Sequence, residues 1–242
     1  MLSELAETLS VPVPRFELFW NQKDEWPRQF VGYRKIGGVS LQKEFIKSPQ
    51  SFYLAKQLAS FLTELHLFPL PKVTQLMIPF MTPSQWRQKY IDLYEQVRRR
   101  VYPLLEKAEV TDTKLLWQDY LVNKANFRFK PVLLHGDLNE EHILCDLDRG
   151  VIIGIIDWDD AFIGDPALNF TWLLDYSGSF IREVLGGYRG NIDRTLLKRA
   201  TFYSRIGSFT EILFGLDTGD EAHLRQGLTY LRSERPKWNK NP

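Results

Sequence analysis

The chain has 242 residues, of which 44% are hydrophobic and 14% aromatic, enough to bury a sizeable core in one large domain or two small ones. Its 31 Lys and Arg balance 30 Asp and Glu, which excludes the basic field of nucleic-acid-binding proteins, and its single cysteine excludes an internal disulfide framework. No apolar run is long enough for a membrane span or resembles a signal sequence, so we expect a cytoplasmic protein without nucleic-acid or membrane partners.

The N-terminal part predicts a short helix followed by a β-hairpin. The helix covers Ser3 to Leu9 and ends at Val11 to Pro14, because proline imposes extended geometry on itself and on the preceding residue. Arg15 to Trp20 and Gln29 to Arg34 then have the composition of strands, and the polar segment Asn21 to Pro27 predicts the turn between them.

Helical periodicity dominates the rest of the chain. Ser48-Pro49 opens a helix in which apolar residues recur at helical spacing, namely Phe52, Ala55, Leu58, Leu62 and Leu65. Further helices are predicted at Trp86 to Lys107, Thr113 to Asn126, Pro166 to Asp175, Arg194 to Phe214 and Glu221 to Leu231. Three apolar runs predict short strands, at Pro131 to Leu134, His142 to Asp146 and Val151 to Ile156. The expected fold class is therefore α+β, mostly helical around a small sheet.

Two acidic residues and an imidazole fall on turns beside these three strands. Asp137 is a candidate catalytic base, or orienter, for a substrate hydroxyl, the alternative being a turn Asp bonded to its own backbone. His142 can reach the same cleft and ligate a metal ion, although Mg²⁺ prefers oxygen and a lone histidine is more often structural. Asp157 ends a buried strand, where its charge calls for a cation or for a Lys or Arg partner. The pattern favours a phosphoryl-transfer site.

Two neighbouring residues are assigned structural roles. Asp165 directly precedes Pro166, which is typical of a helix N-cap with proline at the first helical position. His135 is expected to tie the loop that carries Asp137 to the strand below Asp157. A metal-assisted hydrolase using Asp137 and Asp157 is a weaker alternative, because no further acidic ligands lie near them in the sequence.

These residues resemble the aminoglycoside phosphotransferase and choline kinase-like family, relatives of the protein kinases. The family's His-Gly-Asp, Ile-Asp-Trp and Gly-Asp-Pro motifs are matched at His135 to Asp137, Ile156 to Trp158 and Gly164 to Pro166. His142 stands where most members have Asn, which is similar to the branches that modify the 2″-hydroxyl of aminoglycosides and the 2′-hydroxyl of macrolides. The resemblance implies that Asp137 is the catalytic residue and that His142 and Asp157 hold Mg²⁺.

The resemblance also implies a protein-kinase-like organisation over nearly the whole chain. Residues 1–38 would form a partial N-lobe with the end of a helix, a hairpin and a hinge, and residues 39–242 the helical C-lobe. The hinge would bind ATP or GTP largely through backbone groups, at Tyr33, Arg34 and Ile36. A cationic substrate would meet acidic residues, for which Asp160, Asp175 and Glu211 are candidates, the alternative being solvated surface charges.

The chain departs from the family at its start. Members begin with three strands that carry a phosphate-covering loop and a Lys, whereas this chain opens partway along the helix that follows them. Neither Lys23 in the hairpin turn nor Lys35 in the hinge replaces that Lys. Two functions stay open: an Mg²⁺-dependent phosphotransferase acting on a small-molecule hydroxyl, such as that of an aminoglycoside, or a non-catalytic binding remnant. For the chain as given we expect little kinase activity and self-association through Arg15 to Arg34.

Overall fold

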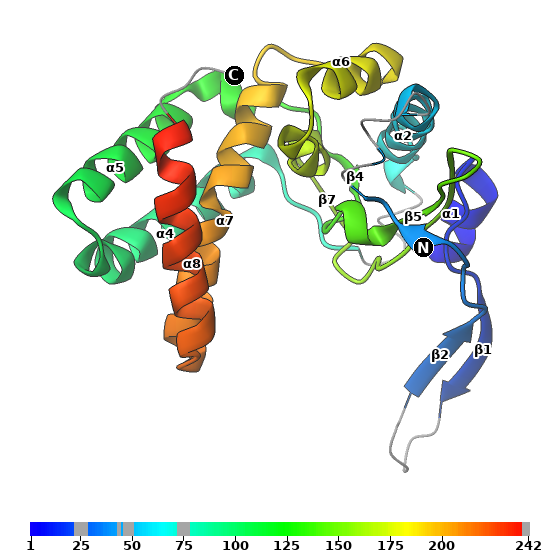
Figure 1. Cartoon of the computed structure of the whole chain (residues 1–242), viewed down its shortest axis with the longest axis horizontal. Helices are drawn as coiled ribbons and strands as arrows, with labels where there is room; N and C mark the ends of the chain where they lie inside the picture. Colours follow the sequence, from blue (N-terminus) through cyan, green and yellow to red (C-terminus); the bar gives the residue numbers. More distant parts are fainter. Residues whose placement is uncertain (22–28, 43–44, 46–50, 72–77, 239–242) are drawn as a thin grey trace. The chain divides into compact units, whose positions relative to one another are not determined.

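The computed structural model describes residues 1–21, 29–42, 45, 51–71 and 78–238, which form two compact units (Figure 1). The first unit combines residues 1–80 with 132–191, and the second combines 81–131 with 192–242. Each unit is thus assembled from two segments that are far apart in the sequence. The lobe boundary expected at residue 38 stays a prediction.

The N-terminal helix and hairpin are confirmed. Helix α1 covers Leu2–Thr8, and β1 (Phe16–Asn21) pairs antiparallel with β2 (Gln29–Tyr33). The predicted turn falls mostly on residues 22–28, which lie outside the described residues. The hairpin carries large exposed apolar side chains, at Leu18, Phe19, Trp20, Phe30, Val31 and Tyr33. Self-association through this segment stays a prediction.

Two small antiparallel sheets carry the loops of the candidate site. One has the strand order β3-β5-β6, built from β3 (Val39–Ser40), β5 (Ile143–Asp146) and β6 (Val151–Ile155). The other pairs β4 (Val132–Leu134) with β7 (Phe162–Gly164). The sequence predicted β4, β5 and β6 but not β3 or β7. Strand β3 has two residues, too few to show a periodicity, and β7 is defined by its pairing with the distant strand β4.

The outer edge of β6 is bound by groups from elsewhere in the first unit. Gln57, on helix α2 (Ser51–His66), accepts a hydrogen bond from the Ile152 amide at 2.9 Å and donates one to the Gly150 carbonyl at 2.9 Å. The Ile155 amide donates to the carbonyl of Pro12 at 2.9 Å. The strand that leads to Asp157 is therefore tied to α2 and to the segment before β1.

Helix α2 confirms the predicted helical spacing, and its predicted start at Ser48-Pro49 lies outside the described residues. Its last residue, His66, is buried between a tyrosine and an asparagine. Nδ1 lies 2.6 Å from the Tyr188 hydroxyl and Nε2 lies 3.1 Å from Asn169 Nδ2. Burial lowers the pKa of His66 to about 3, so the ring is neutral at physiological pH.

Acidification from pH 7 to pH 5 is expected to destabilise the first unit through His66. The unfolded chain takes up a proton near the ordinary pKa of 6.5, whereas folded His66 does so only at about 3. The contribution of neutral His66 to the free energy of unfolding is therefore fully present above pH 6.5. It decreases between pH 6.5 and pH 3, by up to about 1.4 kcal/mol per pH unit. Denaturant unfolding at both pH values measures the decline. His66→Gln should flatten it and the exposed His223→Gln should not; an unchanged decline in His66→Gln would contradict the assignment.

Helix α6 (Gly178–Gly187) packs on α2 and was not predicted from the sequence. Its glycines weaken the helical signal, because glycine loses much conformational freedom in a helix. The packing uses one of them: a Cβ on Gly187 would lie 2.8 Å from the Cβ of Ala59. The glycine content that weakens the helical pattern of α6 in the sequence therefore also allows α6 to pack closely on α2.

The second unit is helical among its described residues. Its elements are α4 (Pro83–Gln96), a π-helical turn η2 (Val97–Val101), η3 (Tyr102–Leu104), α5 (Lys107–Val122), η4 (Lys124–Phe127), α7 (Leu196–Thr218), α8 (Glu221–Glu234) and η8 (Arg235–Lys237). The predicted continuous helix from Trp86 to Lys107 is wrong beyond Gln96, because the chain changes winding there and Pro103 cannot continue an α-helical hydrogen-bond ladder. Helix α5 starts earlier than predicted, at a capping box formed by Glu106 and Glu109.

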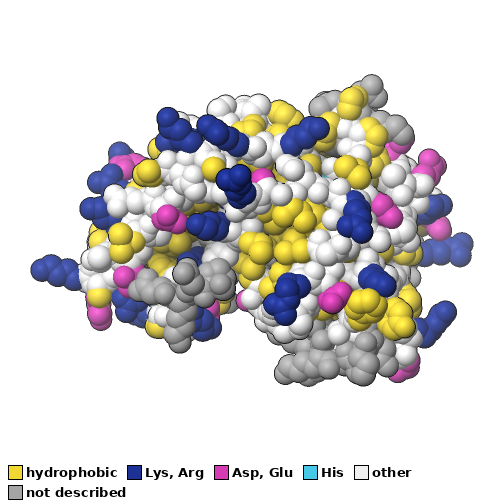
Figure 2. Space-filling model, turned by 90° about the horizontal axis from the view of Figure 1, so that it is seen from above, with side chains coloured by type: hydrophobic (Ala, Val, Ile, Leu, Met, Phe, Trp, Pro, Cys, Tyr) yellow, Lys and Arg dark blue, Asp and Glu magenta, His cyan; other side chains and the backbone are white. Residues whose placement is uncertain are grey.

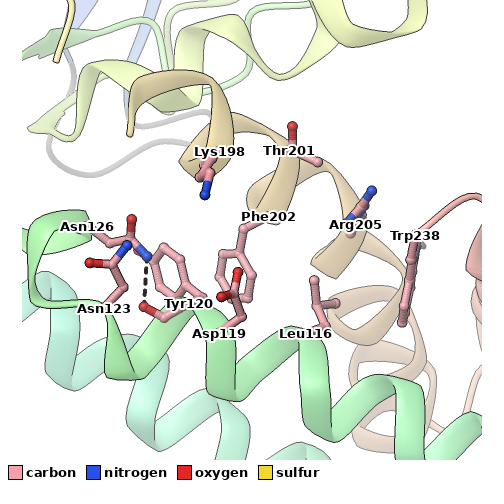
Figure 3. Close-up of a pocket in the computed structure, with 10 residues that line it drawn as sticks. All are labelled: Leu116, Asp119, Tyr120, Asn123, Asn126, Lys198, Thr201, Phe202, Arg205 and Trp238. Atoms are coloured by element: carbon pink, nitrogen blue, oxygen red, sulfur yellow. Dashed lines mark hydrogen bonds between the residues drawn. The ribbon is translucent and has the colours of Figure 1, made fainter. Parts of the chain in front are cut away.

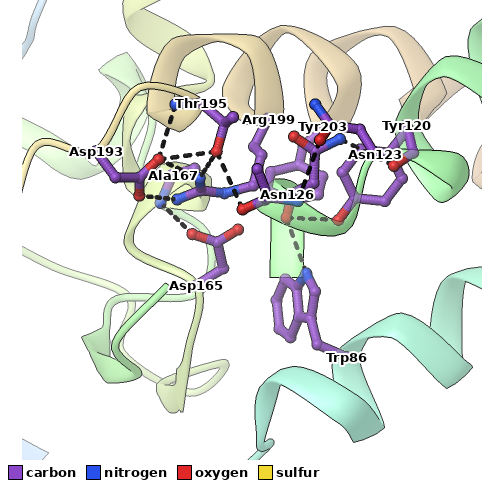
Figure 4. Close-up of polar contacts among 11 residues, drawn as sticks. Trp86, Tyr120, Asn123, Asn126, Asp165, Ala167, Asp193, Thr195, Arg199 and Tyr203 are labelled. Carbon is purple, nitrogen blue, oxygen red and sulfur yellow. Dashed lines mark hydrogen bonds and ion pairs between the residues drawn. The ribbon is translucent and has the colours of Figure 1, made fainter. Parts of the chain in front are cut away.

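Buried polar contacts connect the helices of the second unit (Figure 4). The Trp86 indole N–H donates to the Tyr203 hydroxyl at 2.8 Å, and the Tyr120 hydroxyl lies 2.9 Å from the same oxygen. Arg199 is fully buried and forms two bonds with Asp193, at 2.8 and 3.0 Å. These pairs satisfy polar groups that would otherwise be costly to bury.

The described surface carries charges of both signs. On the face drawn in Figure 2, Lys and Arg side chains are dispersed among acidic and uncharged side chains. No helix in the described part of the chain is both long enough and apolar enough to cross a membrane.

Candidate active site

The loop between β4 and β5 begins with His135 and Gly136 and is fixed against the turn that follows β6. Gly136 has a φ of +94°, and a Cβ there would lie 1.9 Å from the backbone oxygen of Asp160. The His135 ring donates from Nε2 to the Ile156 carbonyl at 2.8 Å. Burial lowers the pKa of His135 to about 4, so this contact is made by the neutral imidazole. Both residues bring the loop close to the start of the Asp157 turn.

Gly136→Ala is expected to destabilise the chain and to disturb this loop. The positive φ alone costs about 1–3 kcal/mol for a residue with a side chain, and the overlap with the Asp160 backbone adds to it. The midpoint of denaturant unfolding is the measurement. Gly186→Ala on α6 is the matched control, because a Cβ there meets nothing within 4 Å and alanine favours a helix. Equal stability of the two variants would refute this account of Gly136.

Asp137 lies two residues after His135, and its side chain is 56% exposed. Asn139 holds it with weak bonds, since its Nδ2 lies 3.3 Å from Asp137 Oδ1 and 3.4 Å from Asp137 O. The Asn139 Oδ1 also accepts from the Glu141 amide at 2.8 Å, capping the short helix η5 (Glu140–His142). Sequence reasoning did not single out Asn139, although an Asn before two Glu residues is a helix-start signal.

The sequence predicted His142 as the first residue of a strand. In the structure His142 is the last residue of η5, and β5 begins at the next residue, Ile143. His142 Nδ1 lies 2.7 Å from the backbone oxygen of Asp137, and because a carbonyl only accepts, Nδ1 carries the proton. In the neutral ring, Nε2 therefore has a free lone pair, and it lies 3.3 Å from Asp157 Oδ2. The structure thus brings Asp137, His142 and Asp157 together.

Asp157 follows β6 with a φ of +64°, the one positive value among the described residues other than glycine. Asp and Asn tolerate this conformation better than most residues. The turn exposes 54% of the Asp157 side chain, while the next residue, Trp158, is buried and its ring lies 4.5 Å from that of His135. Among the described residues no Lys or Arg pairs with Asp157; its Oδ2 faces His142 Nε2 at 3.3 Å, and the exposed part of the carboxylate is open to solvent or to a bound cation.

The donor atoms suit Mg²⁺ held by few protein ligands. No group of three or more His, Cys, Asp or Glu in the described chain could by itself hold a metal. Mg²⁺ at nucleotide sites takes one or two protein ligands and completes its shell with water and phosphate oxygens. Asp157 offers the preferred oxygen, and Nε2 of His142, the ring nitrogen that does not contact the Asp137 carbonyl, lies 3.3 Å from it, so the two donor atoms fit such an ion.

The other predicted residues have different surroundings. Asp160 is exposed beside Gly136, and Asp175 is exposed at the end of η7 (Trp172–Asp175). Asp165 is fully buried and caps η6 (Pro166–Phe170) by accepting from the Ala167 amide at 3.0 Å (Figure 4). Glu211 belongs to the second unit, on α7, where its Oε1 lies 3.7 Å from His223 Nε2.

Two of the three predicted hinge residues line a pocket of about 410 Å³ in the first unit. Arg34 and Ile36 contribute to it together with Ala6, Leu9, Ser10, Pro12, Val13, Arg15 and Glu17. Arg34 Nε pairs with Glu17 Oε2 at 3.0 Å. Tyr33 is 44% exposed, and its ring lies 6.1 Å from that of Phe16. Ile36 packs so closely on β6 that a Cβ at Gly154 would lie 2.6 Å from its side chain.

The chain is similar to known proteins over most of its length. Residues 1–199 match the family described as "Phosphotransferase enzyme family". Viomycin phosphotransferase from Streptomyces vinaceus is 26% identical over 219 residues, or 86% of this chain and 71% of that protein. The uncharacterized protein YcbJ from Bacillus subtilis (strain 168) is 30% identical over 174 residues; the match covers 70% of this chain and 54% of that protein.

Solved structures show the same fold. The GDP and kanamycin complex of APH(2")-IIia has a TM-score of 0.88 and 30% identity, covering 98% of this chain and 80% of that chain. Macrolide 2'-phosphotransferase type I has a TM-score of 0.76 and 24% identity, covering 95% and 76%, and shows the fold alone. The predicted fold class is confirmed by these likenesses.

Proposed function

Since the chain belongs to the phosphotransferase enzyme family, we propose that it transfers the γ-phosphate of a nucleoside triphosphate to a hydroxyl of a small molecule. The observation that carries this proposal is the position of His142. One ring nitrogen donates to the backbone of Asp137, and the other lies 3.3 Å from the carboxylate of Asp157. These contacts support the proposal because they hold the proposed base and the two proposed metal ligands side by side.

In the proposed reaction, Asp137 orients the substrate hydroxyl and accepts its proton. The hydroxyl oxygen forms a bond to the γ-phosphorus while the bond from that phosphorus to the β–γ bridging oxygen breaks, releasing the nucleoside diphosphate. Asp157 and His142 would hold Mg²⁺, which supplies charge neutralisation on the phosphate oxygens when bound. Asn139 would position Asp137 through its amide.

We propose that the donor nucleotide, ATP or GTP, meets the hinge at Tyr33, Arg34 and Ile36. The likeness to an enzyme solved with GDP supports a nucleotide donor. The closeness of Ile36 to Gly154 supports a hinge that is fixed relative to β6. Because backbone groups at a hinge can recognise either base, both ATP and GTP are candidate donors.

We propose a cationic antibiotic as the substrate class, with aminoglycosides and viomycin as the first compounds to test. The similar proteins include a viomycin phosphotransferase and an enzyme solved with kanamycin, which supports this class. Asp160 is exposed beside the loop of Asp137 and would meet a substrate amine; Asp175 and Glu211 are proposed for the same role.

A phosphotransfer assay tests the proposal. The purified chain is incubated with Mg²⁺ and ATP or GTP, with and without kanamycin or viomycin, and products are identified by mass. A product heavier by one phosphoryl group, formed together with nucleoside diphosphate, would support the proposal. Nucleotide hydrolysis at the same rate without an acceptor would favour a hydrolase. Nucleotide binding without any turnover would favour a non-catalytic binding protein.

A further inference from the structure

A cavity of about 430 Å³ lies within the second unit, between α5 and α7 (Figure 3). Helix α5 contributes Leu116, Asp119 and Tyr120, and its C-cap residue Asn123 also lines the cavity. Helix α7 contributes residues that include Lys198, Phe202 and Arg205. The volume is in the range of small-molecule sites, and none of these residues serves the proposed phosphotransfer.

Two basic side chains on α7 line the cavity without an ion-pair partner among the described residues. Lys198 and Arg205 are seven residues apart, so they lie two turns apart on the same helix face. Arg205 is half-buried, and this burial lowers its pKa. In the part of the chain that the structure describes, neither cation has an ion-pair partner, whereas Arg199 and Arg232 of the same unit do. A half-buried guanidinium facing a cavity without a counter-ion favours an anionic ligand.

The number of charges favours a ligand with one negative charge. Asp119 is the acidic residue that lines the cavity, and it is exposed. Together with Lys198 and Arg205 it gives the lining a net charge of about +1 at neutral pH. A carboxylate matches this balance better than a phosphate monoester, which carries nearly two negative charges at pH 7.

Buried polar atoms without partners point to further ligand contacts. The Trp238 indole N–H is buried and donates to no described atom. Asn126 is 4% exposed; its Nδ2 donates to the Tyr120 carbonyl at 2.8 Å, but its Oδ1 has no partner among described residues. Unpaired buried groups of this kind are costly, so the cavity favours a ligand that offers both an acceptor and a hydrogen-bond donor.

The cavity also has flat aromatic walls. The rings of Tyr120 and Phe202 are stacked with centroids 3.7 Å apart and an interplanar angle of 3°. The Tyr120 hydroxyl is fixed by that of Tyr203 at 2.9 Å. Trp238 closes the other end (Figure 3). Rigid rings of this kind favour a planar ligand over a flexible aliphatic one.

We propose that this cavity binds a planar organic carboxylate that carries a hydroxyl or amino donor. Its carboxylate pairs with Lys198 and Arg205, its ring contacts Tyr120 and Phe202, and its donor meets the free oxygen of Asn126. This site is distinct in its chemistry from the proposed phosphotransfer site, and either can fail without the other.

Isothermal titration with three matched probes tests the proposal. 6-Hydroxy-2-naphthoate has every proposed feature, 6-hydroxy-2-naphthamide lacks the charge, and 2-naphthoate lacks the donor. The parent chain should bind the first at least tenfold more tightly than the second, because a hydrogen bond to a charged group is worth about that factor. A smaller loss is expected for the third. Equal affinity for the carboxylate and the amide would overturn the proposal.

Variants locate the binding. Arg205→Gln should weaken the hydroxynaphthoate about tenfold and leave the amide unchanged. Arg225→Gln is the control, because Arg225 forms an exposed pair with Glu221 on α8. If Arg205→Gln does not fold, Lys198→Gln, at an exposed position, provides the same comparison, and Trp238→Phe removes the indole N–H while keeping an aromatic ring. Carboxylate binding that is unaffected by the cation changes would overturn the site.

Discussion

Asp137→Asn is expected to lower kcat for phosphotransfer by roughly 10²–10⁴-fold while the fold stays intact. The change keeps the shape of the side chain and removes only its charge and its capacity to accept a proton. The side chain is more than half exposed, and His142 contacts the Asp137 backbone oxygen, which the substitution retains. The Asn139 amide can still donate to the remaining oxygen of the new side chain. The expected loss is therefore one of chemistry rather than of structure.

Steady-state kinetics with kanamycin or viomycin, whichever the phosphotransfer assay identifies as an acceptor, measures this loss. We expect kcat to fall and KM for the nucleotide to change little, because Asp137 is not proposed to contact the nucleotide or the metal. Asp148→Asn is the control, since Asp148 is an exposed carboxylate in the turn between β5 and β6. Near-parental turnover by Asp137→Asn, with Asp148→Asn also active, would refute the proposed base.

Asp157→Asn is expected to weaken Mg²⁺-dependent nucleotide binding by a factor on the order of 10², and His142→Ala by about tenfold. Asp157 supplies a negative charge to the ion, whereas His142 supplies a neutral lone pair. Asparagine is the informative substitution at Asp157 because it also tolerates the φ of +64°. Alanine there would add backbone strain to the loss of the ligand.

Titration of Mg²⁺ at a fixed concentration of a fluorescent nucleotide measures the two effects. Binding is the better readout for His142→Ala, because that change also removes the hydrogen bond to Asp137 and would affect turnover indirectly. Denaturant unfolding checks that both variants are folded. An Mg²⁺ dependence in Asp157→Asn equal to that of the parent would refute the assignment of Asp157.

The sequence predicted those parts of the fold that carry their signal locally. Helix α2 has a long apolar stripe, and β6 is a continuous apolar run that ends at a charged residue, so each could be recognised alone. Strands β3 and β7 are defined by pairing with the distant strands β5 and β4, and α6 is rich in glycine, so none of the three could be recognised from its local sequence. The composition of the two units depends on contacts between distant segments, which no local pattern contains.

The candidate site could also be predicted only in part from the sequence. Residue types and spacing left Asp137 between a turn residue and a catalytic one, and Asp157 between a Lys or Arg partner and a bound cation; the family resemblance favoured the functional role for each. The sequence alone left His142 between a structural and a metal-binding role. The feature that favours a ligand is the direction of its ring, which is set by the carbonyl of Asp137. Asn139 carried only a helix-start signal, because its amide contacts with Asp137 depend on the loop conformation.

The bound edge of β6 also has a consequence for assembly between molecules. An edge strand with free amides can act as a template on which a strand of another chain adds, as in amyloid growth. Here the outward amides of Ile152 and Ile155 are already occupied by Gln57 and Pro12. Intermolecular strand addition at this sheet would first have to break those bonds, so the strand that positions Asp157 is protected by the chain's own groups rather than by charged side chains.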